Sequence, residues 1–398
     1  MKFYTIIFLY SLFPSMLLAQ LGNKELTRKA ALQLAQERNP QVQLANTKKE
    51  KQMALRGAAL SINAPEVIFE APTSTELRPG VLQTFDFPTT YIRKFQAQKQ
   101  QIGMAETEKK ITLNQLRYQV NTTYNDMQYL REVLLSYQHQ DSLLEDVLEV
   151  SSVRLQVGQI SNLEKLNAQS QYREVQYQLN QIKSKLRTAG VKMSLLTGNL
   201  NDTGLYAADN FEKLPLTAYM IQTDGMFSNN PLTLFYEQSK RLQKALLNQN
   251  KSYWMPGLVV GYLNQGADNT PTPYRMRYGF TFPLWFWGNI SQVKAAKKEL
   301  KVAEQQAVLN QYELNGNYTQ AISELKQYTE ALNYYEQTAL PQAEDIASTA
   351  IEGYRLGSIG YYNYLLNLQQ VIKIRLGYLE ALKNYNQAIY TIQYLRGE

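Results

Sequence analysis

The chain has 398 residues, no cysteine, and a formal net charge of +7 from 41 basic and 34 acidic side chains. The charge is mild and no dense basic run occurs, so the composition does not suggest a nucleic-acid partner. Without cysteine there can be no disulfides, and stability must come from packing or assembly.

The first residues have the features of a secretory signal peptide. Lys2 supplies a positive charge, residues 3–18 are mostly apolar, and residues 17–20 read Leu-Leu-Ala-Gln, a small-residue cleavage site. The apolar run is shorter than the roughly 20 residues that a membrane-spanning helix needs, and Pro14 interrupts it. We therefore expect residues 1–19 to be a cleaved signal; the alternative is a retained membrane anchor.

A set of landmarks occurs twice in the same order. The spacing between the two copies grows only slightly along the chain, as expected when loops lengthen between two copies of one unit. We predict a first repeat over residues 20–210 and a second over residues 211–398. The landmarks and their second copies are Asn39-Pro40 and Asn230-Pro231, Pro65 and Pro256, Phe85-Asp86-Phe87-Pro88 and Phe280-Thr281-Phe282-Pro283, and Gly158-Gln159-Ile160-Ser161 and Gly357-Ser358-Ile359-Gly360.

Each repeat contains a pair of expected β-strands, four in all. Residues 275–282 alternate strictly, with polar or small residues at odd numbers and apolar residues at even numbers. This alternation fits an ordinary antiparallel sheet on a core, or the lipid-facing wall of a barrel with aromatic residues at its rim, which Trp285-Phe286-Trp287 resembles. A closed barrel needs about eight strands, so several copies would have to share one. We expect the strands at about residues 66–72, 81–88, 257–264 and 275–283.

Two long stretches follow the strand pairs, from about residue 91 to 158 and from about 290 to 357. They show helical periodicity with almost no glycine or proline. A helix of 60 residues would be roughly 90 Å long. Each stretch ends at a landmark glycine and precedes a return helix, at about 161–197 and 361–396. The sequence therefore predicts two long helical hairpins with their tips at these glycines.

Three kinds of motif combine with this order of elements. They are Leu26-Thr27-x3-Ala31-Leu32-x-Leu34-Ala35-x3-Asn39-Pro40 at the start, Phe-x-Phe-Pro after each strand pair, and the Gly-x-Ile tips, the first of them followed by Leu166-Asn167-Ala168-Gln169. With these motifs the chain resembles the TolC-like outer-membrane efflux channels of Gram-negative bacteria. The resemblance covers essentially the whole mature chain, and it rests on the duplicated set rather than on any single motif.

The resemblance implies a mainly α-helical fold with a small β part and a homotrimeric assembly. Each protomer would give four strands to a twelve-stranded transmembrane β-barrel, and the long hairpins would form an α-barrel that reaches into the periplasm. Such a channel is the exit duct of a tripartite efflux or export system and catalyses no reaction. Its implied partners are a periplasmic adaptor (a membrane fusion protein) and an inner-membrane pump, of the resistance-nodulation-division type.

The hairpin tips are the candidates for adaptor docking, helix against helix; for any one residue, a plain helix C-cap with a turn is the alternative. The two glycines suit a left-handed turn position. The candidates are Arg154, Leu155, Gly158, Gln159, Ile160 and Ser161 at the first tip, and Tyr354, Arg355, Leu356, Gly357, Ser358 and Ile359 at the second.

A second candidate site is the periplasmic aperture. Well-studied relatives have an acidic pair there, whereas Asn363 and Leu366 stand at the corresponding positions. The nearby tyrosines suggest an aperture closed by packing and hydroxyl hydrogen bonds, or they simply fill the hairpin core. The aperture candidates are Glu164, Tyr361, Tyr362, Asn363 and Tyr364. In the strands, Arg275 and Arg277 are expected to face the barrel lumen, which would spare them the cost of contact with lipid.

We expect no catalytic, cofactor-binding or metal site. His139 is the only histidine in the sequence, and no Gly-x4-Gly-Lys-Ser/Thr phosphate loop is present. Two other functions remain open from the sequence. One is an adaptor-like periplasmic coiled-coil protein that links envelope components, although one hairpin with β-rich flanks would then be expected. The other is an envelope enzyme. The tip around Gly357 faintly resembles the cation-efflux branch, but the cargo cannot be read from the sequence.

Overall fold

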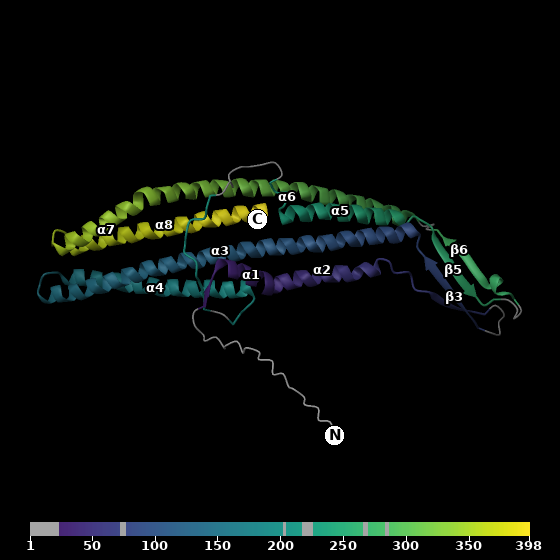
Figure 1. Cartoon of the computed structure of the whole chain (residues 1–398), viewed down its shortest axis with the longest axis horizontal. Helices are drawn as coiled ribbons and strands as arrows, with labels where there is room; N and C mark the ends of the chain where they lie inside the picture. Colours follow the sequence, from purple (N-terminus) through teal and green to yellow (C-terminus); the bar gives the residue numbers. More distant parts are fainter. Residues whose placement is uncertain (1–23, 72–76, 202–203, 217–225, 266–269, 283–285) are drawn as a thin grey trace, which may run out of the picture.

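The computed structural model describes residues 24–71, 77–201, 204–216, 226–265, 270–282 and 286–398. The predicted signal peptide at 1–19 lies outside these ranges, as do Pro283 and Trp285. The molecule is elongated, with a small sheet at one end and two helical hairpin tips at the other (Figure 1).

The helices form the body of the molecule and confirm the two predicted hairpins. In the first, α3 is 69 residues long, which corresponds to roughly 100 Å. It begins earlier than predicted because Pro88 occupies the first turn, where its missing N–H costs nothing. The helices are α1 (Arg28–Arg38), α2 (Pro40–Ala58), α3 (Pro88–Gln156), α4 (Asn162–Thr197), α5 (Pro231–Ser252), α6 (Phe286–Tyr334), α7 (Leu340–Arg355) and α8 (Tyr361–Arg396).

The second long helix is not uniform. A π-helical turn, η2 (Tyr335–Ala339), separates α6 from α7. Pro341 lies in the first turn of α7 and cannot donate a backbone hydrogen bond, so the α-helical bonding pattern changes just before it. The Tyr335 side chain lies against Gly377 of α8, where a Cβ atom would meet the tyrosine hydroxyl. The sequence periodicity did not reveal this turn.

The helices lie side by side in one order. α2 and α4 form one flank, α3 lies next to them, α5 and α8 come next, and α6 with α7 forms the other flank (Figure 1). Each long helix thus packs on the two shorter helices of its own repeat, and α3 also packs on α5 and α8 of the second repeat. Within the described residues, no helix holds a stretch apolar and long enough to cross a membrane.

In both repeats the Asn-Pro landmark caps a helix and joins it to the end of another helix. Asn39 accepts a hydrogen bond from the backbone N–H of Gln41 (2.8 Å), which caps α2, and its amide donates to the carbonyl of Leu196 in α4 (2.9 Å). Asn230 caps α5, and its amide donates to the carbonyl of Leu395 in α8 (2.7 Å). The end of each return helix is therefore tied to the start of a short leading helix, and the two continue each other end to end.

Two glycines outside the predicted landmarks make these end-to-end joints possible. Gly198 after α4 has φ +73°, and Gly397 after α8 has φ +77°. A Cβ atom on Gly198 would lie 2.5 Å from the carbonyl oxygen of Arg38, and one on Gly397 would lie 2.8 Å from Cδ of Pro231. A glycine directly after a helical pattern was the available signal.

The four predicted strands form one antiparallel sheet in the order β2-β3-β5-β6, which joins the two repeats. Its last strand starts one residue later than expected, because residues 272–275 form a short 3₁₀ turn, η1 (Thr272–Arg275). A separate parallel pair, β1 (Lys24–Leu26) with β4 (Leu205–Ala207), was not predicted. The strands of the main sheet are β2 (Glu66–Glu70), β3 (Arg78–Phe85), β5 (Gly257–Leu263) and β6 (Met276–Thr281).

Candidate functional site

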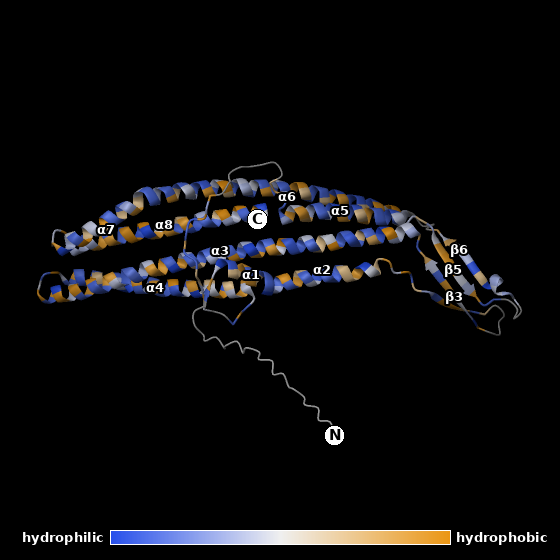
Figure 2. Cartoon of the chain, in the orientation of Figure 1, coloured by the Kyte–Doolittle hydropathy of each residue, from blue (hydrophilic) through white to orange (hydrophobic). Residues whose placement is uncertain are grey.

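The sheet end is the first candidate site, because one face of the sheet is apolar and exposed. Residues that lie opposite each other in neighbouring strands have side chains on the same side of the sheet, so the register defines its two faces. The sheet extends beyond the ends of the helices (Figure 1), and Figure 2 shows hydrophobic residues along its strands. Exposed large apolar side chains share one face: Val67, Phe69, Val81, Leu258, Tyr262, Tyr278 and Phe280.

The opposite face of the sheet carries the charged residues, with small residues and a few apolar ones between them. Its members by the same register are Glu66, Glu70, Arg78, Gly80, Thr84, Gly261, Arg277, Gly279 and Thr281, together with Ile68, Leu82, Val259, Gly257 and Leu263. The predicted alternation of residues 276–281 is therefore confirmed, with odd-numbered residues on the polar face. A sheet with one exposed apolar face and one charged face is what a barrel wall requires when lipid lies outside and water inside.

The two arginines predicted to face a lumen take different positions. Arg277 lies within β6 on the polar face, is exposed, and donates to Oε1 of Gln265 (2.6 Å). Arg275 belongs to η1, before the strand begins, and its guanidinium contacts the side chain of Asn264. The assignment of both to a lumen remains a prediction.

The two hairpin tips, the second candidate site, are built alike on the predicted glycines. Gly158 and Gly357 both have φ +73°. At the first tip the N–H of Gln159 donates to the carbonyl of Arg154 (2.9 Å), and at the second the N–H of Ser358 donates to the carbonyl of Gly353 (2.9 Å). These bonds close a left-handed C-cap in which glycine is the favoured residue.

The two tips differ at the start of the return helix. The Ser161 hydroxyl accepts from the N–H of Glu164, and the Glu164 carboxylate accepts from the N–H of Ser161, each at 3.2 Å. This capping box occupies the acidic side chain that the sequence offered as an aperture residue. At the second tip Gly360 stands in the capping position and has no side chain for this purpose. The tips are thus alike in backbone and different in charge.

A cluster of aromatic side chains joins the two hairpins just behind the tips. The Arg154 guanidinium from α3 lies 4.9 Å from the ring centre of Tyr354 in α7. Tyr354 stacks on Tyr364 of α8 with ring centres 4.7 Å apart. Tyr361 and Tyr364 are each 6% exposed, whereas Tyr362 is 64% exposed. Of the alternatives left open by the sequence, the structure places Tyr361 and Tyr364 in the core between the hairpins. Burial raises the pKa of Tyr361 to about 12 and also raises that of Tyr364.

The remaining tip candidates are mostly exposed. The exposed candidates are Gly158, Gln159, Ser161, Arg355, Leu356, Gly357, Ser358, Tyr362 and Asn363; Arg154, Leu155, Ile160, Glu164, Tyr354 and Ile359 are partly buried.

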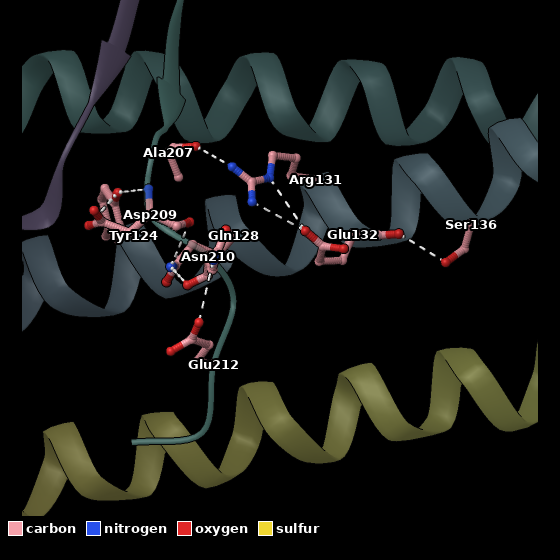
Figure 3. Close-up of polar contacts among 9 residues, drawn as sticks. All are labelled: Tyr124, Gln128, Arg131, Glu132, Ser136, Ala207, Asp209, Asn210 and Glu212. Carbon is pink, nitrogen blue, oxygen red and sulfur yellow. Dashed lines mark hydrogen bonds and ion pairs between the residues drawn. The ribbon is translucent and has the colours of Figure 1, made fainter. Parts of the chain in front are cut away.

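A third polar site lies at the middle of the molecule and was missed in the sequence. Residues 208–216 pass from α3 to α8 (Figure 3). On α3, the Tyr124 hydroxyl lies 2.9 Å from a carboxylate oxygen of Asp209, and Gln128 donates to the carbonyl of Asn210 (2.6 Å). On α8, the side chain of Asn386 accepts from the N–H of Leu214 and donates to the carbonyl of residue 212, both at 3.0 Å.

This crossing segment, residues 208–216, links the first hairpin to the second at the middle of the molecule. Burial raises the pKa of Tyr124 to about 12, so its hydroxyl stays protonated and able to donate. Arg131 adds a bond to the carbonyl of Ala207 (2.7 Å; Figure 3). A polar cavity of about 490 Å³ lies beside the segment, with Arg28 and Lys213 among its lining residues. Scattered single residues of this kind carry no recognisable spacing in the sequence.

Within the described residues, no group of three or more histidine, cysteine or carboxylate side chains is placed to hold a metal ion. His139, the single histidine, is exposed on α3.

With two long hairpins, end-to-end joints and a four-stranded sheet at one end, the fold is that of the TolC-like outer-membrane channels, as the sequence resemblance predicted. The CmeC outer membrane channel of Campylobacter jejuni is similar with a TM-score of 0.77 and 17% identity, over 93% of this chain and 85% of that one. The outer membrane protein VceC of Vibrio cholerae gives a TM-score of 0.73 and 14% identity, over 93% of this chain and 96% of that one.

A relative also appears by sequence. The cobalt-zinc-cadmium resistance protein CzcC of Cupriavidus metallidurans is 24% identical over 250 residues, which are 63% of this chain. The matched part spans 60% of the length of that relative. No model of a known protein family matches the chain. The mainly helical fold class predicted from the sequence is confirmed by the structural likeness.

Proposed function

We propose that this chain is the outer-membrane exit duct of a tripartite efflux or export system in a Gram-negative bacterium. In this proposal copies of the chain join their sheets into a β-barrel through the outer membrane. Their helices form a tunnel through the periplasm, and cargo passes along it without any chemical step. The two repeats of each protomer, proposed at 20–210 and 211–398, contribute equivalent parts to the tunnel.

The observation that carries the proposal is the exposed apolar face of the sheet. Phe69 is 65% exposed, Tyr278 76% and Phe280 66%, and all three point to the same side. A contiguous apolar patch of this kind is rarely left in water. Lipid on this face and water on the face that carries Arg277 would satisfy both sides of the sheet at once.

The flanks of the helical layer support a ring of copies. Inside one protomer α3 packs on α5 and α8, which belong to the other repeat. The equivalent contact for α6 and α7 would be with α2 and α4 of a neighbouring copy. Exposed apolar side chains lie on both flanks, with Leu44 and Met53 on α2 and Val308 and Tyr312 on α6. A homotrimer, with twelve strands in one barrel, would bring such flanks together.

The proposed partners are an adaptor that binds the hairpin tips and a pump that drives transport. A periplasmic adaptor would dock on the exposed residues around Gly158 and Gly357, and an inner-membrane pump of the resistance-nodulation-division type would supply the energy. The name of the relative CzcC makes cobalt, zinc and cadmium ions the first cargo to test. The alternative of an adaptor-like protein is not favoured, because the similar structures are channels.

The test combines location, assembly and conductance. We expect the mature protein in the outer-membrane fraction, as an oligomer whose gel mobility changes on heating, and we expect purified protein to conduct ions across a planar bilayer. A protein that is monomeric in detergent and passes no ions would refute the proposal. Deletion of the gene should also sensitise cells to the exported compound, with cobalt, zinc and cadmium salts tried first.

A further inference from the structure

The helix ends next to the sheet are rich in basic residues. The twelve residues of each helix nearest the sheet are 47–58 in α2, 88–99 in α3, 241–252 in α5 and 286–297 in α6 (Figure 1). Together they hold twelve of the 41 basic side chains of the chain and one of its 34 acidic side chains, Glu50. The positive net charge of the protein is therefore concentrated at this end, although no single segment forms a basic run.

Most of these basic side chains face solvent. Ten of the twelve are exposed. The described ion pairs of the group are Lys49 with Glu106 (3.7 Å) and Lys94 with Asp86 (2.7 Å). Exposed like charges repel one another, so an anionic surface beside them would lower their free energy.

A band of exposed apolar side chains lies next to this basic group, on the side of the sheet. It occupies the segments that connect strands to helices and the first two turns of α3 and α6. Tryptophan is enriched at the level of lipid headgroups, and a lysine on an apolar surface can extend its charged end to the headgroups. The band consists of Leu60, Ile62, Ile92, Trp254, Phe282 and Trp287.

The length of the strands places a membrane surface near this band. The four strands have 5, 8, 7 and 6 residues, whereas a strand that spans a bilayer needs about 9–11. The hydrocarbon layer that covers the apolar face of the sheet must therefore extend past the strands. The exposed apolar band continues that face toward the helices, which brings the headgroups to the first helical turns.

The polar face of the sheet continues into the helices at Lys94. This lysine donates to Oδ2 of Asp86 (2.7 Å) and lies 6.0 Å from the ring centre of Tyr253. Asp86 and Tyr253 line a cavity of about 280 Å³ together with Thr281, which is on the polar face. Lys94 is therefore on the side of the body that would meet the water of the channel.

Three exposed lysines lie on other sides of their helices. Lys99 is about 140° around α3 from Lys94, and Lys251 is about 160° around the end of α5 from Tyr253. The third lysine follows the exposed Trp287 of α6 by seven residues, which places the two on the same side of the helix. We call Lys99, Lys251 and Lys294 the collar lysines.

We propose that the collar lysines bind the phosphate groups of anionic phospholipids in the inner leaflet of the outer membrane. This inference rests on the proposed function, because it assigns the lipid contacts at the end that would enter the membrane. Lys251, one residue before the end of α5, is nearest the sheet. Lys99 and Lys294 act through the surface potential of the leaflet, which decays over about 8 Å at physiological salt.

Charge complementarity favours lipid over a second copy of the chain. The 48 residues at this level of each copy contain one carboxylate, that of Glu50. A neighbouring copy in a ring would present the same basic level and could not supply the counter-charge. An anionic leaflet supplies it around the whole assembly, and both repeats contribute basic residues to the contact.

Lipid competition tests the proposal on the full-length oligomer in a neutral detergent. The oligomer is mixed with equal amounts of phosphatidylglycerol and phosphatidylcholine, and the lipids that remain bound after purification are counted by mass spectrometry. We expect a preference for phosphatidylglycerol of roughly fivefold or more, the effect of one lysine near an anionic surface. At about 1 M salt, where screening acts over about 3 Å, the preference should fall toward one.

A triple substitution locates the contact. Lys99→Gln/Lys251→Gln/Lys294→Gln should remove most of the preference, and Lys251→Gln should have the largest effect of the three single substitutions. The matched control is Lys183→Gln/Lys185→Gln/Lys192→Gln. It removes the same charge from three exposed positions of α4, far from the sheet, and it should keep the preference of the wild type.

The outcomes separate this inference from the proposed function. A conducting wild-type oligomer that retains both lipids equally, or a preference that persists in high salt or in the triple variant, overturns the headgroup contact and leaves the channel in place. If the triple variant forms no oligomer in detergent while the control does, the lysines join copies instead, which also overturns it. A wild-type protein that is monomeric and non-conducting overturns both proposals.

Discussion

At the scale of single residues, the sequence predicted positions that have an unusual backbone or a local pattern. Gly158 and Gly357 were placed at the tips by their position after a helical stretch, and both have a left-handed backbone. The Ser161-x-x-Glu164 pattern is itself a capping-box signal, although the sequence placed Ser161 among the docking candidates and Glu164 among the aperture candidates. The sequence could not sort Tyr361 from Tyr362, because burial there depends on how two hairpins meet.

Tyr361 should make the stability of the tip depend on alkaline pH. Its pKa is raised from 10.0 to about 12 by burial, so the folded state holds the proton more tightly than the unfolded state. This contribution is complete below pH 10 and is lost as the pH rises toward 12. The loss amounts to about 2–3 kcal/mol for one tyrosine at the upper limit.

The measurement is thermal unfolding from pH 8 to about 12 for Tyr361→Phe and Tyr362→Phe. The first variant should lose less stability than the wild type over this range, and the second, at an exposed tyrosine, should follow the wild type. Identical pH profiles for all three proteins would contradict the assignment.

Gly198 should tolerate a side chain far less well than an ordinary helical glycine. Gly198→Ala places a Cβ 2.5 Å from the carbonyl oxygen of Arg38 at a φ of +73°. We expect it to lower the free energy of unfolding by roughly 2–4 kcal/mol. Gly316→Ala, in α6 with no described atom within 4 Å of the added Cβ, should be neutral or stabilising by about 0.5–1 kcal/mol. Denaturant unfolding compares the two, and equal effects would count against the joint.

At the scale of elements, the long helices and the strand pairs were predictable because their periodic patterns run over many residues. The π turn η2 was not predicted, since it combines Pro341 of the next helix with the contact of Tyr335 with Gly377, which is far along the chain. β1 and β4 have three residues each, too few for an alternating pattern to appear. The joints between α4 and α2 and between α8 and α5 depend on spatial continuation, which adjacent sequence does not encode.

The Asn-Pro landmarks should contribute equally to both joints. Asn39→Ala and Asn230→Ala each remove a helix cap and leave the carbonyl of a return helix without its partner. We expect a loss of roughly 1–3 kcal/mol from each. Asn180→Ala, at an exposed position of α4, is the control and should change stability little. Calorimetry measures all three, and a large loss in one landmark only would argue against equivalent joints.

At the scale of the whole molecule, the duplicated landmarks were enough to predict two hairpins and two pairs of strands, which the structure joins into one four-stranded sheet. They could not predict the crossing segment at the middle of the molecule, where residues 208–216 bind α3 on one side and α8 on the other. These bonds join residues that are far apart in sequence and have no common spacing. The faces of the sheet were predictable, because the alternation in 276–281 survives in the register with β5.

The apolar face should tolerate no charge if it meets lipid. Phe280→Lys places an ammonium group on that face one residue before the end of β6, where the cost of contact with lipid is smaller than the roughly 2–4 kcal/mol at the bilayer centre. We expect it to reduce the amount of oligomer in the outer membrane. Thr281→Lys, at the next residue on the polar face, should assemble normally. The amounts are measured by membrane fractionation with quantitative blotting, and equal assembly of both variants would contradict the orientation of the sheet.

The joints at Gly198 and Gly397 also determine how the body transmits force. A rod made of two stacked helices bends where they meet, whereas α3 and the α6–α7 helix pass these points without a break in the chain. The elastic stiffness of the long axis is therefore supplied at mid-length by these two helices. A force applied at the tips is transmitted to the sheet along α3 and α6–α7. The stacked helices support these two helices laterally on either side of each joint.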